Sequence, residues 1–225
     1  MIPEQTAPAF RVRFEKTGPI RFISHLDLTR AFHRAFARAQ IPLKFSEGFS
    51  PHPKFSFALP LSVGTESLTE FADFTLKPGC ELTPDELKEK LQAQMPAGIK
   101  ILEVGEQKEK FSLIAFARYS VFLPKAKKED IPSYESALKG PLVIQKKNKK
   151  GKWVEKDISG GIHLVEWKEK DGGVEMIGVL SAAGENYLKP ELILSVLAEK
   201  CPSFNTEEKE ILRTQVLKED QTLFS

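Results

Sequence analysis

Cysteine is nearly absent from this sequence, and its scarcity excludes several classes of site. Only Cys80 and Cys201 occur among the 225 residues, and they are too far apart to indicate a disulfide framework or a cysteine-rich metal site. There is no CxxxCxxC motif, so the chain cannot hold an iron–sulfur cluster in the manner of radical-SAM enzymes. The carboxylates of Asp27, Glu66, Glu70 and Asp73 show no spacing typical of metal ligands. We therefore expect neither a metal nor another cofactor.

Long apolar segments are also missing. No apolar run approaches the roughly 20 residues that a membrane-spanning helix needs, and the opening MIPEQTAPAF lacks the apolar core of a signal peptide. No activated-nucleophile motif is present either. These absences lead us to expect a cytoplasmic protein without a membrane partner, and they favour a non-catalytic role over an enzyme.

Basic and acidic residues are present in similar numbers but unevenly distributed. The formal net charge is only +2, and the 41% hydrophobic and 28% charged content is typical of a globular protein. Between Ala9 and Pro60, nine Lys and Arg residues stand against three acids, whereas residues 61–110 carry six basic residues against ten acids. This asymmetry indicates a cationic surface in the first part of the chain. The alternative is a face that only keeps the protein soluble.

An amphipathic helix between Ser24 and Ile41 carries part of this charge. Two stripes recur in it every four residues, an apolar one and a basic one: Leu28, Phe32 and Phe36, and Arg30, Arg34 and Arg38. The offset of two positions is about 200° at 3.6 residues per turn, so the stripes lie on opposite faces. The spacing therefore predicts that one face packs on a sheet while three guanidinium groups point into solvent.

The loop that follows, residues 46–54, is rich in residues with special backbone properties. Gly48 permits a positive φ, and Pro51 and Pro53 each lock φ, so the loop can present backbone N–H groups to phosphates. Phe49, His52 and Lys54 add a stacking surface, a hydrogen-bonding group and a charge. We interpret it as a surface that binds an anionic ligand. A loop that merely joins two elements is the alternative.

The order of the expected elements predicts the fold class. In the first half, period-two strands and capped helices alternate as β-α-β-β-α-β, the ferredoxin-like arrangement. The expected strands are 10–14, 55–59, 70–76 and 99–104, and a second helix begins at Thr83-Pro84. The second half repeats the plan, with hairpins around residues 148–151 and 171–173. We therefore predict an α+β protein with tandem ferredoxin-like domains and antiparallel sheets, divided into residues 1–108 and 109–225.

Four further features need an interpretation, and the first two of them have competing ones. His25 and His52 would form a general acid–base pair for RNA cleavage if the fold brought them together, although framing the helix and ordering the loop are the simpler roles. The lysine run 146–152 is typical of a solvated hairpin tip, and it could also contact phosphates without sequence preference. For Trp153 and Trp167 we expect core packing, and for Glu70 and Asp73 the role of ordinary edge residues.

The stretch from Gly18 to Ser67 resembles the radical-SAM-linked protein family of bacteria, a family of unknown function. The resemblance is carried by the landmarks Arg21-Phe22, Ser24-His25-Leu26-Asp27, Arg30, Arg34, Pro42, Ser46-Glu47-Gly48-Phe49, Pro51-His52-Pro53, Pro60-Leu61 and Gly64. It is distinctive over residues 10–76 and looser at Lys156-Asp157-Ile158, Lys189-Pro190-Glu191 and Arg213-Thr214. Members are either separate chains or C-terminal extensions of radical-SAM proteins.

This resemblance implies a radical-SAM enzyme as partner and, from the family's usual gene setting, an RNA context. A weaker similarity is to the CRISPR repeat-processing endoribonucleases, whose C-terminal glycine-rich loop is missing here, since residues 217–225 contain no glycine. We expect an RNA-binding or substrate-presenting accessory protein. A metal-independent endoribonuclease and a protein-docking module without RNA contact remain the alternatives. The residues expected to bind RNA or a partner are Arg21, Arg30, Arg34, Arg38, Gly48, Phe49, His52 and Lys54.

Overall fold

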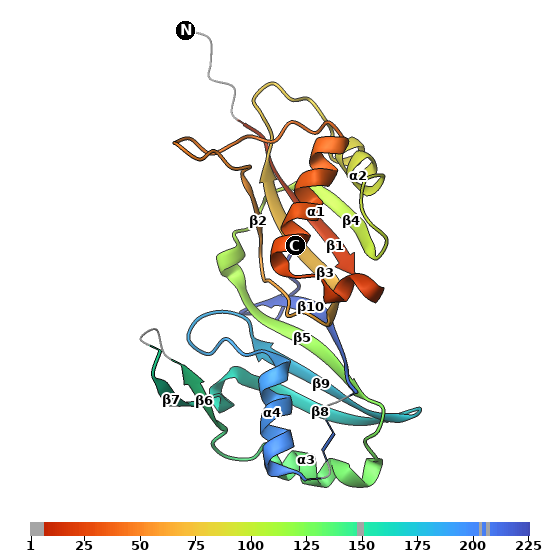
Figure 1. The fold of residues 1–225 in the computed structure, drawn as a ribbon, viewed down its shortest axis with the longest axis vertical. Helices are drawn as coiled ribbons and strands as arrows, with labels where there is room; N and C mark the ends of the chain where they lie inside the picture. Colours follow the sequence, from red (N-terminus) through yellow and green to blue (C-terminus); the bar gives the residue numbers. More distant parts are fainter. Residues whose placement is uncertain (1–6, 148–150, 203, 206–207) are drawn as a thin grey trace. The chain divides into compact units, whose positions relative to one another are not determined.

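The computed structural model describes residues 7–147, 151–202, 204–205 and 208–225. The chain divides into two compact units, residues 1–111 together with Ser225, and residues 112–224 (Figure 1). Both units combine helices with antiparallel strands, so the expected α+β class is confirmed. In the part of the chain that is described, no helix is both long and apolar enough to cross a membrane.

The first unit contains one antiparallel sheet in the order β4-β1-β3-β2. Its register places Val12 of the central strand opposite Ala72 on one side and Val104 on the other. The elements are β1 Ala9–Lys16, the 3-10 helix η1 Gly18–Phe22, α1 His25–Arg38, β2 Phe55–Phe57, β3 Thr65–Thr75, α2 Pro84–Gln92 and β4 Ile99–Glu106.

Helix α1 packs against the sheet through the predicted apolar stripe. Its first turn is capped by the Ser24 side chain, which accepts a hydrogen bond from the backbone N–H of Asp27 at 3.1 Å. The rings of Phe32 and Phe36 are fully buried, and Phe32 contacts Phe14 of β1 with ring centroids 4.9 Å apart. In Figure 1, α1 crosses the sheet over β1 and β3. The buried apolar face thus leaves the arginine face of α1 exposed, as predicted.

Helix α2 begins with the motif that the sequence indicates. The Thr83 side chain accepts from the backbone N–H of Glu86 at 3.3 Å, and the Glu86 carboxylate accepts from the backbone N–H of Thr83 at 2.8 Å. This reciprocal capping box satisfies two N–H groups that a helix start otherwise leaves without partners. Leu87 and Leu91 are the buried residues of α2 and complete the core of the unit.

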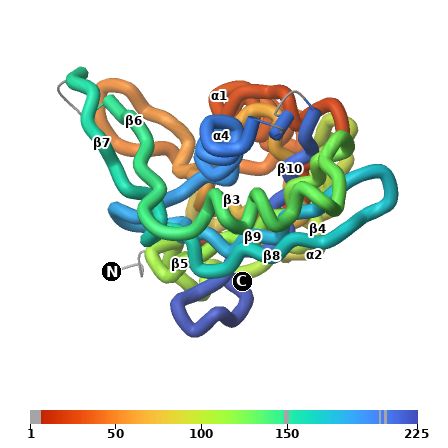
Figure 2. The backbone as a smooth tube through the Cα atoms, turned by 90° about the horizontal axis from the view of Figure 1, so that it is seen from below, coloured from red at the N-terminus to blue at the C-terminus, as the bar shows by residue number. Residues whose placement is uncertain are grey.

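The second unit contains an antiparallel sheet in the order β10-β5-β9-β8 and a separate two-stranded hairpin, β6-β7. Figure 2 shows α4 on one face of the sheet and the hairpin running outward from the rest of the unit. The elements are β5 Ile114–Leu123, α3 Ile131–Ala137, β6 Val143–Lys147, β7 Trp153–Asp157, β8 Ile162–Lys170, β9 Gly173–Ser181, α4 Pro190–Lys200 and β10 Glu210–Lys218.

Several expectations about single elements need adjustment. The hairpin expected at residues 171–173 is confirmed, since β8 ends at Lys170 and β9 starts at Gly173. The turn expected at residues 148–151 lies for its first three residues outside the described part of the chain. Strand β2 is shorter than expected, because the loop that follows it begins at residue 58. Strand β3 is longer than expected, because its pairing with β1 extends back to Ser67.

Two side-chain expectations were wrong. Trp153 is 65% exposed instead of packed in a core, because the strands of its hairpin pair only with each other among the described residues. Glu70 is only 4% exposed instead of lying at an edge, because β3 is an interior strand of the sheet and Glu70 pairs there with Phe14 of β1. Local sequence does not reveal either placement, since both depend on which strands become neighbours.

Candidate nucleic-acid interface

The loop predicted as a binding surface is closed at its base by backbone hydrogen bonds. The N–H of Lys54 donates to the carbonyl of Lys44 at 2.8 Å, and the N–H of Ser46 donates to the carbonyl of His52 at 2.8 Å. The N–H of Lys44 donates in turn to the carbonyl of Thr75 at the end of β3, again at 2.8 Å. Residues 46–52 therefore form an arm that is anchored on the sheet of the first unit and projects from it.

Inside the arm, His52 and Ser46 hold the backbone together. The Ser46 hydroxyl lies 2.9 Å from Nδ1 of His52 and also accepts the backbone N–H of His52 at 3.1 Å. Gly48 has φ +119°, a value that residues with a Cβ rarely adopt. Beyond it the Phe49 side chain is wholly exposed. The arm thus presents an aromatic ring to solvent, and His52 orders the loop that carries it.

A cleft of about 430 Å³ lies at the foot of this arm, beside the edge strand β2. The residues that give it its chemistry are His52, Lys54, Phe55, Asp73, Gln107, Lys110 and Phe111. Its two lysines come from segments that are far apart in the sequence. The one carboxylate in the lining, that of Asp73, already accepts hydrogen bonds from Arg11 and Gln107. The cleft is therefore basic and has an aromatic wall.

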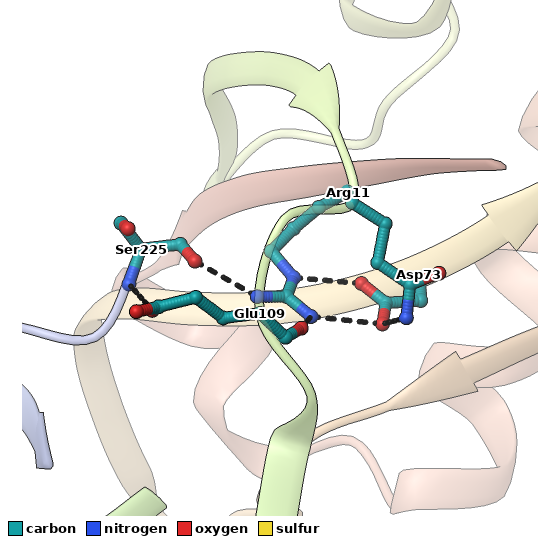
Figure 3. Close-up of polar contacts among 5 residues, drawn as sticks. Arg11, Asp73, Glu109 and Ser225 are labelled. Atoms are coloured by element: carbon teal, nitrogen blue, oxygen red, sulfur yellow. Dashed lines mark hydrogen bonds and ion pairs between the residues drawn. The ribbon is translucent and has the colours of Figure 1, made fainter. Parts of the chain in front are cut away.

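Arg11 holds the Asp73 carboxylate in place, as Figure 3 shows. Its guanidinium donates to both oxygens of Asp73 at 2.7 and 2.9 Å, to the carbonyl of Glu109 at 2.6 Å and to the carbonyl of Ser225 at 2.8 Å. It also lies 4.6 Å from the centroid of the Phe111 ring. Arg11 is only 5% exposed, so it is a structural residue that holds the 109–111 segment beside the cleft.

Sequence reasoning missed this arrangement. Period-two alternation over residues 10–14 puts Arg11 on the face opposite Phe10 and Phe14, but it gives no partner for the guanidinium. In the structure Arg11 is directly opposite Asp73 in the pairing of β1 with β3. The sequence does place a basic residue, Arg11, and an acidic residue, Asp73, on two expected strands. Only the register of β1 against β3 shows that the two side chains meet.

The arginine stripe of α1 is exposed, but its members differ in what they contact. Arg30 donates to the carboxylate of Asp27 at 3.0 Å, and hydrogen bonds from Ser24 and Arg30 lower the pKa of Asp27. Arg38 donates through Nε to the side-chain oxygen of Gln94 at 3.0 Å. A terminal nitrogen of the same guanidinium donates to the backbone carbonyl of Gln94. Arg34 makes no hydrogen bond or ion pair with any residue that the structure describes. Arg34 is therefore the member best able to accept a new anionic partner.

Arg21 has a different environment from the stripe. Its guanidinium pairs with Glu66 at 3.2 Å and stands 4.9 Å from the ring centroid of Phe22. The same carboxylate accepts the backbone N–H of Gly18 at 2.7 Å. Arg21 thus helps to fix the turn between β1 and α1.

His25 and His52 have separate environments. The His25 ring packs edge-on against Phe57 at 5.3 Å, whereas the ring of His33, two turns further along α1, packs against Phe55 at 5.5 Å. His52 lies three residues before Phe55, the first residue of β2, whereas His25 contacts Phe57, the last residue of that strand. The two histidines are therefore associated with opposite ends of β2. Within the described residues no contact joins His25 to His52, and this arrangement offers no support for an acid–base pair.

The second unit has a larger cleft of about 680 Å³ with different chemistry. His163 Nε2 lies 2.8 Å from the hydroxyl of Ser181, and the His163 ring packs against Phe116. The charged residues in its lining are Lys218, Glu185, Glu219 and Asp220. Because carboxylates outnumber the lysine, this cleft does not suit a polyanion. Across the described residues there is no group of three potential metal ligands.

The protein is thus of the α+β class, with a basic, aromatic-walled cleft in its first unit and no metal-ligand cluster among the described residues. The chain belongs to a bacterial family whose model is described as "Uncharacterized protein conserved in bacteria (DUF2344)" and matches residues 9–190. The matched range includes the whole arm, the first cleft and most of the second unit.

Two other comparisons add little. No curated protein matches the sequence. Among solved structures, the chain is similar to one described as "X-ray crystal structure of a heavy metal efflux pump, crystal form II", with 8% identity and a TM-score of 0.27. The match covers 94% of this chain but only 28% of that one. A likeness at this TM-score carries no argument about fold or function.

Proposed function

We propose that this protein is a non-catalytic accessory protein that binds RNA and presents it to a radical-SAM RNA-modifying enzyme in the cytoplasm. The observation that carries the RNA proposal is the basic cleft with the exposed arm beside it. Lys54 and Lys110 suit backbone phosphates, and the rings of Phe49 and Phe111 suit stacking with unpaired bases. Arg34 of α1 supplies a further exposed cation outside the cleft.

The choice of partner rests on the resemblance described above. A chain without a cysteine cluster for an iron–sulfur cofactor would leave the radical chemistry to another protein. The accessory protein would then raise the local concentration of RNA at that enzyme and orient it, which is how a binding protein speeds a bimolecular reaction.

We further propose that the two units are tandem ferredoxin-like domains, with the boundary at residues 111 and 112 instead of the expected 108 and 109. In each unit the first strand is central and flanked by the last strand and the third strand, which supports this assignment: the orders are β4-β1-β3-β2 and β10-β5-β9-β8. The β6-β7 hairpin would then be an insertion between the first helix and the second strand of the second domain.

A second candidate function, protein docking without RNA contact, is favoured by exposed apolar side chains near the start of α1. Phe22, Leu26 and Val63 are each more than half exposed. A Cβ at Gly64, next to Val63, would lie 3.9 Å from the Phe22 ring, so Phe22 and the 63–64 turn are neighbours. Single exposed apolar residues are common, whereas a neighbouring pair suits a protein surface.

RNA binding measured by fluorescence anisotropy across a salt series tests the leading proposal. We expect Lys54→Glu with Lys110→Glu to weaken binding and to reduce the slope of log affinity against log salt by about 1.4, since each phosphate contact on a single strand contributes about 0.7. Lys77→Glu with Lys100→Glu is the matched control, because both lysines are exposed and lie outside the cleft. Equal losses in the two variants, or no RNA binding at low salt, would refute the assignment and favour docking.

A further inference from the structure

The β6-β7 hairpin carries an exposed tryptophan next to lysines. Trp153 pairs directly with Lys147 across the hairpin, and the Lys147 ammonium lies 5.0 Å from the centroid of the indole ring. The indole is 65% exposed. Tryptophan is normally well covered in folded proteins, so its exposure here on a regularly paired strand requires a reason other than core packing.

The base of the hairpin is fixed, so the tryptophan has a defined position on it. The carboxylate of Asp157 accepts the backbone N–H groups of Leu142 at 3.0 Å and Ser159 at 2.9 Å, and these hydrogen bonds lower the pKa of Asp157. The Lys156 ammonium donates to the carbonyl of Glu185. These contacts tie the lower half of the hairpin to the rest of the second unit.

Charge is segregated along the hairpin. The acids Glu155 and Asp157 lie toward the base, and Glu155 accepts a hydrogen bond from Gln145 at 3.2 Å. The outer described part contains only basic and apolar side chains, namely Lys146, Lys147, Lys152, Trp153 and Val154. The outer half thus combines one exposed aromatic face with several cations.

We propose that the described outer residues of this hairpin, centred on Trp153 and Lys147, are a binding site for single-stranded RNA, separate from the cleft of the first unit. An unpaired base stacks on Trp153, and Lys147 on the same side of the hairpin contacts a flanking phosphate. Lys146 and Lys152, on the opposite side, add positive charge that attracts the RNA strand. The inference rests on the proposed function in one respect, the choice of RNA as the anion. Duplex RNA does not fit, because its bases are already stacked and their faces are not accessible.

The apolar groups of the hairpin do not form one continuous face, which argues against insertion into a lipid surface. Trp153 pairs with Lys147 and Val154 pairs with Lys146, and successive residues of a strand point to opposite sides. A membrane-binding hairpin would instead gather its apolar side chains on a single side.

Tryptophan fluorescence gives a direct test, because the chain has only two tryptophans. In the full-length Trp167→Phe variant, Trp153 is the sole tryptophan. Trp167 is only partly exposed and packs on Tyr134 with ring centroids 5.2 Å apart. We expect a ten-nucleotide single-stranded RNA to quench Trp153 and to protect it from acrylamide, with the effect lost as salt rises, and we expect the matching duplex to do neither. The reciprocal Trp153→Phe variant, which reports on Trp167, should show no quenching.

Affinity supplies the second measurement. We expect Trp153→Ala to weaken single-stranded RNA binding about 5- to 150-fold, the range found for loss of one base–aromatic stack, and Trp153→Phe to recover part of the loss. Both changes are at an exposed position, so thermal unfolding should be unaffected.

The outcomes separate this proposal from the proposed function. RNA binding with unchanged Trp153 fluorescence would overturn the hairpin site and leave the first cleft standing. Quenching that persists in the Lys54→Glu, Lys110→Glu background would support the hairpin site independently of that cleft. Protection of Trp153 by anionic phospholipid vesicles but not by RNA would overturn the proposal in favour of a lipid surface. No binding of RNA by any assay would overturn both.

Discussion

Arg11 and Asp73 are joined by two hydrogen bonds of 2.7 and 2.9 Å between neighbouring strands of the first unit. Paired charges in this geometry satisfy both carboxylate oxygens with one planar guanidinium. Through its other donors Arg11 also contacts the carbonyls of Glu109 and Ser225. The pair therefore links the sheet to residues 109–111, which end in Phe111 on the wall of the basic cleft. Arg11 holds this wall in place although Arg11 itself does not line the cleft.

Removing one member of this pair should be strongly destabilising. Arg11→Met leaves the Asp73 carboxylate nearly buried without its counter-ion, and Asp73→Leu does the same to the guanidinium. For such cases about 3–5 kcal/mol of stability is lost. We expect a lower midpoint in urea unfolding for each single variant and a smaller combined loss in the Arg11→Met, Asp73→Leu double variant than the sum of the two. Strictly additive losses in this double-mutant cycle would show that the two residues do not interact.

The arm should depend on glycine at position 48. Gly48→Ala introduces a Cβ where φ is +119°, which strains the backbone although the surrounding space is open. We expect faster amide exchange in residues 46–52 and weaker RNA binding, with global stability little changed because the arm is exposed. Gly105→Ala is the control, since its surroundings are also open and no positive φ is involved. Unchanged exchange in Gly48→Ala would show that the arm tolerates other backbone conformations.

Stability should depend on pH through His33. Burial lowers the pKa of His33 from its usual value of 6.5, so the unfolded chain binds this proton more readily than the folded chain does. The stabilisation from neutral His33 is complete above pH 6.5 and is lost as the pH falls below that value toward the folded-state pKa. We expect urea midpoints of the wild type to fall between pH 7 and pH 5 more steeply than those of His33→Phe. Parallel pH profiles of the two proteins would contradict this expectation.

Arg34 and Arg38 should respond differently to charge reversal, although both belong to the same predicted stripe. Arg34→Glu should reduce RNA affinity and its salt dependence while leaving thermal stability nearly unchanged, because Arg34 makes no hydrogen bond or ion pair with the described residues. Arg38→Glu should lower the melting temperature, because Arg38 donates two hydrogen bonds to Gln94. Anisotropy and thermal unfolding of the two variants check both statements. Unchanged RNA affinity in Arg34→Glu would remove α1 from the interface.

Much of the first unit was predictable because its signals are local. The four-residue spacing of Leu28, Phe32 and Phe36 indicates a helix with one buried face, and the structure confirms it. The Thr83 capping box acts over three residues and is likewise confirmed. The loop at residues 46–54 was identified from its glycine and prolines, and its exposed Phe49 agrees with the expectation of an accessible surface. Its role in binding stays a prediction.

The composition of the cleft could not be predicted, because its lining comes from segments that meet only in the folded chain. Lys54 follows the arm, whereas Lys110 lies more than fifty residues later and was not among the expected binding residues. Trp153 was expected in a core on the grounds of its size. It is exposed because, among the described residues, β6 and β7 pair only with each other and not with a strand of the larger sheet.

The sequence by itself determined the α+β class, the helix faces and the special character of the arm, since periodicity, capping and backbone preference act within a few residues. Only the tertiary structure decided that Arg11 faces Asp73, that Lys54 and Lys110 share one cleft and that Trp153 is exposed. These relationships depend on strand register and on the order of strands in a sheet. Both are set by packing between distant segments, for which a single sequence carries no local signal.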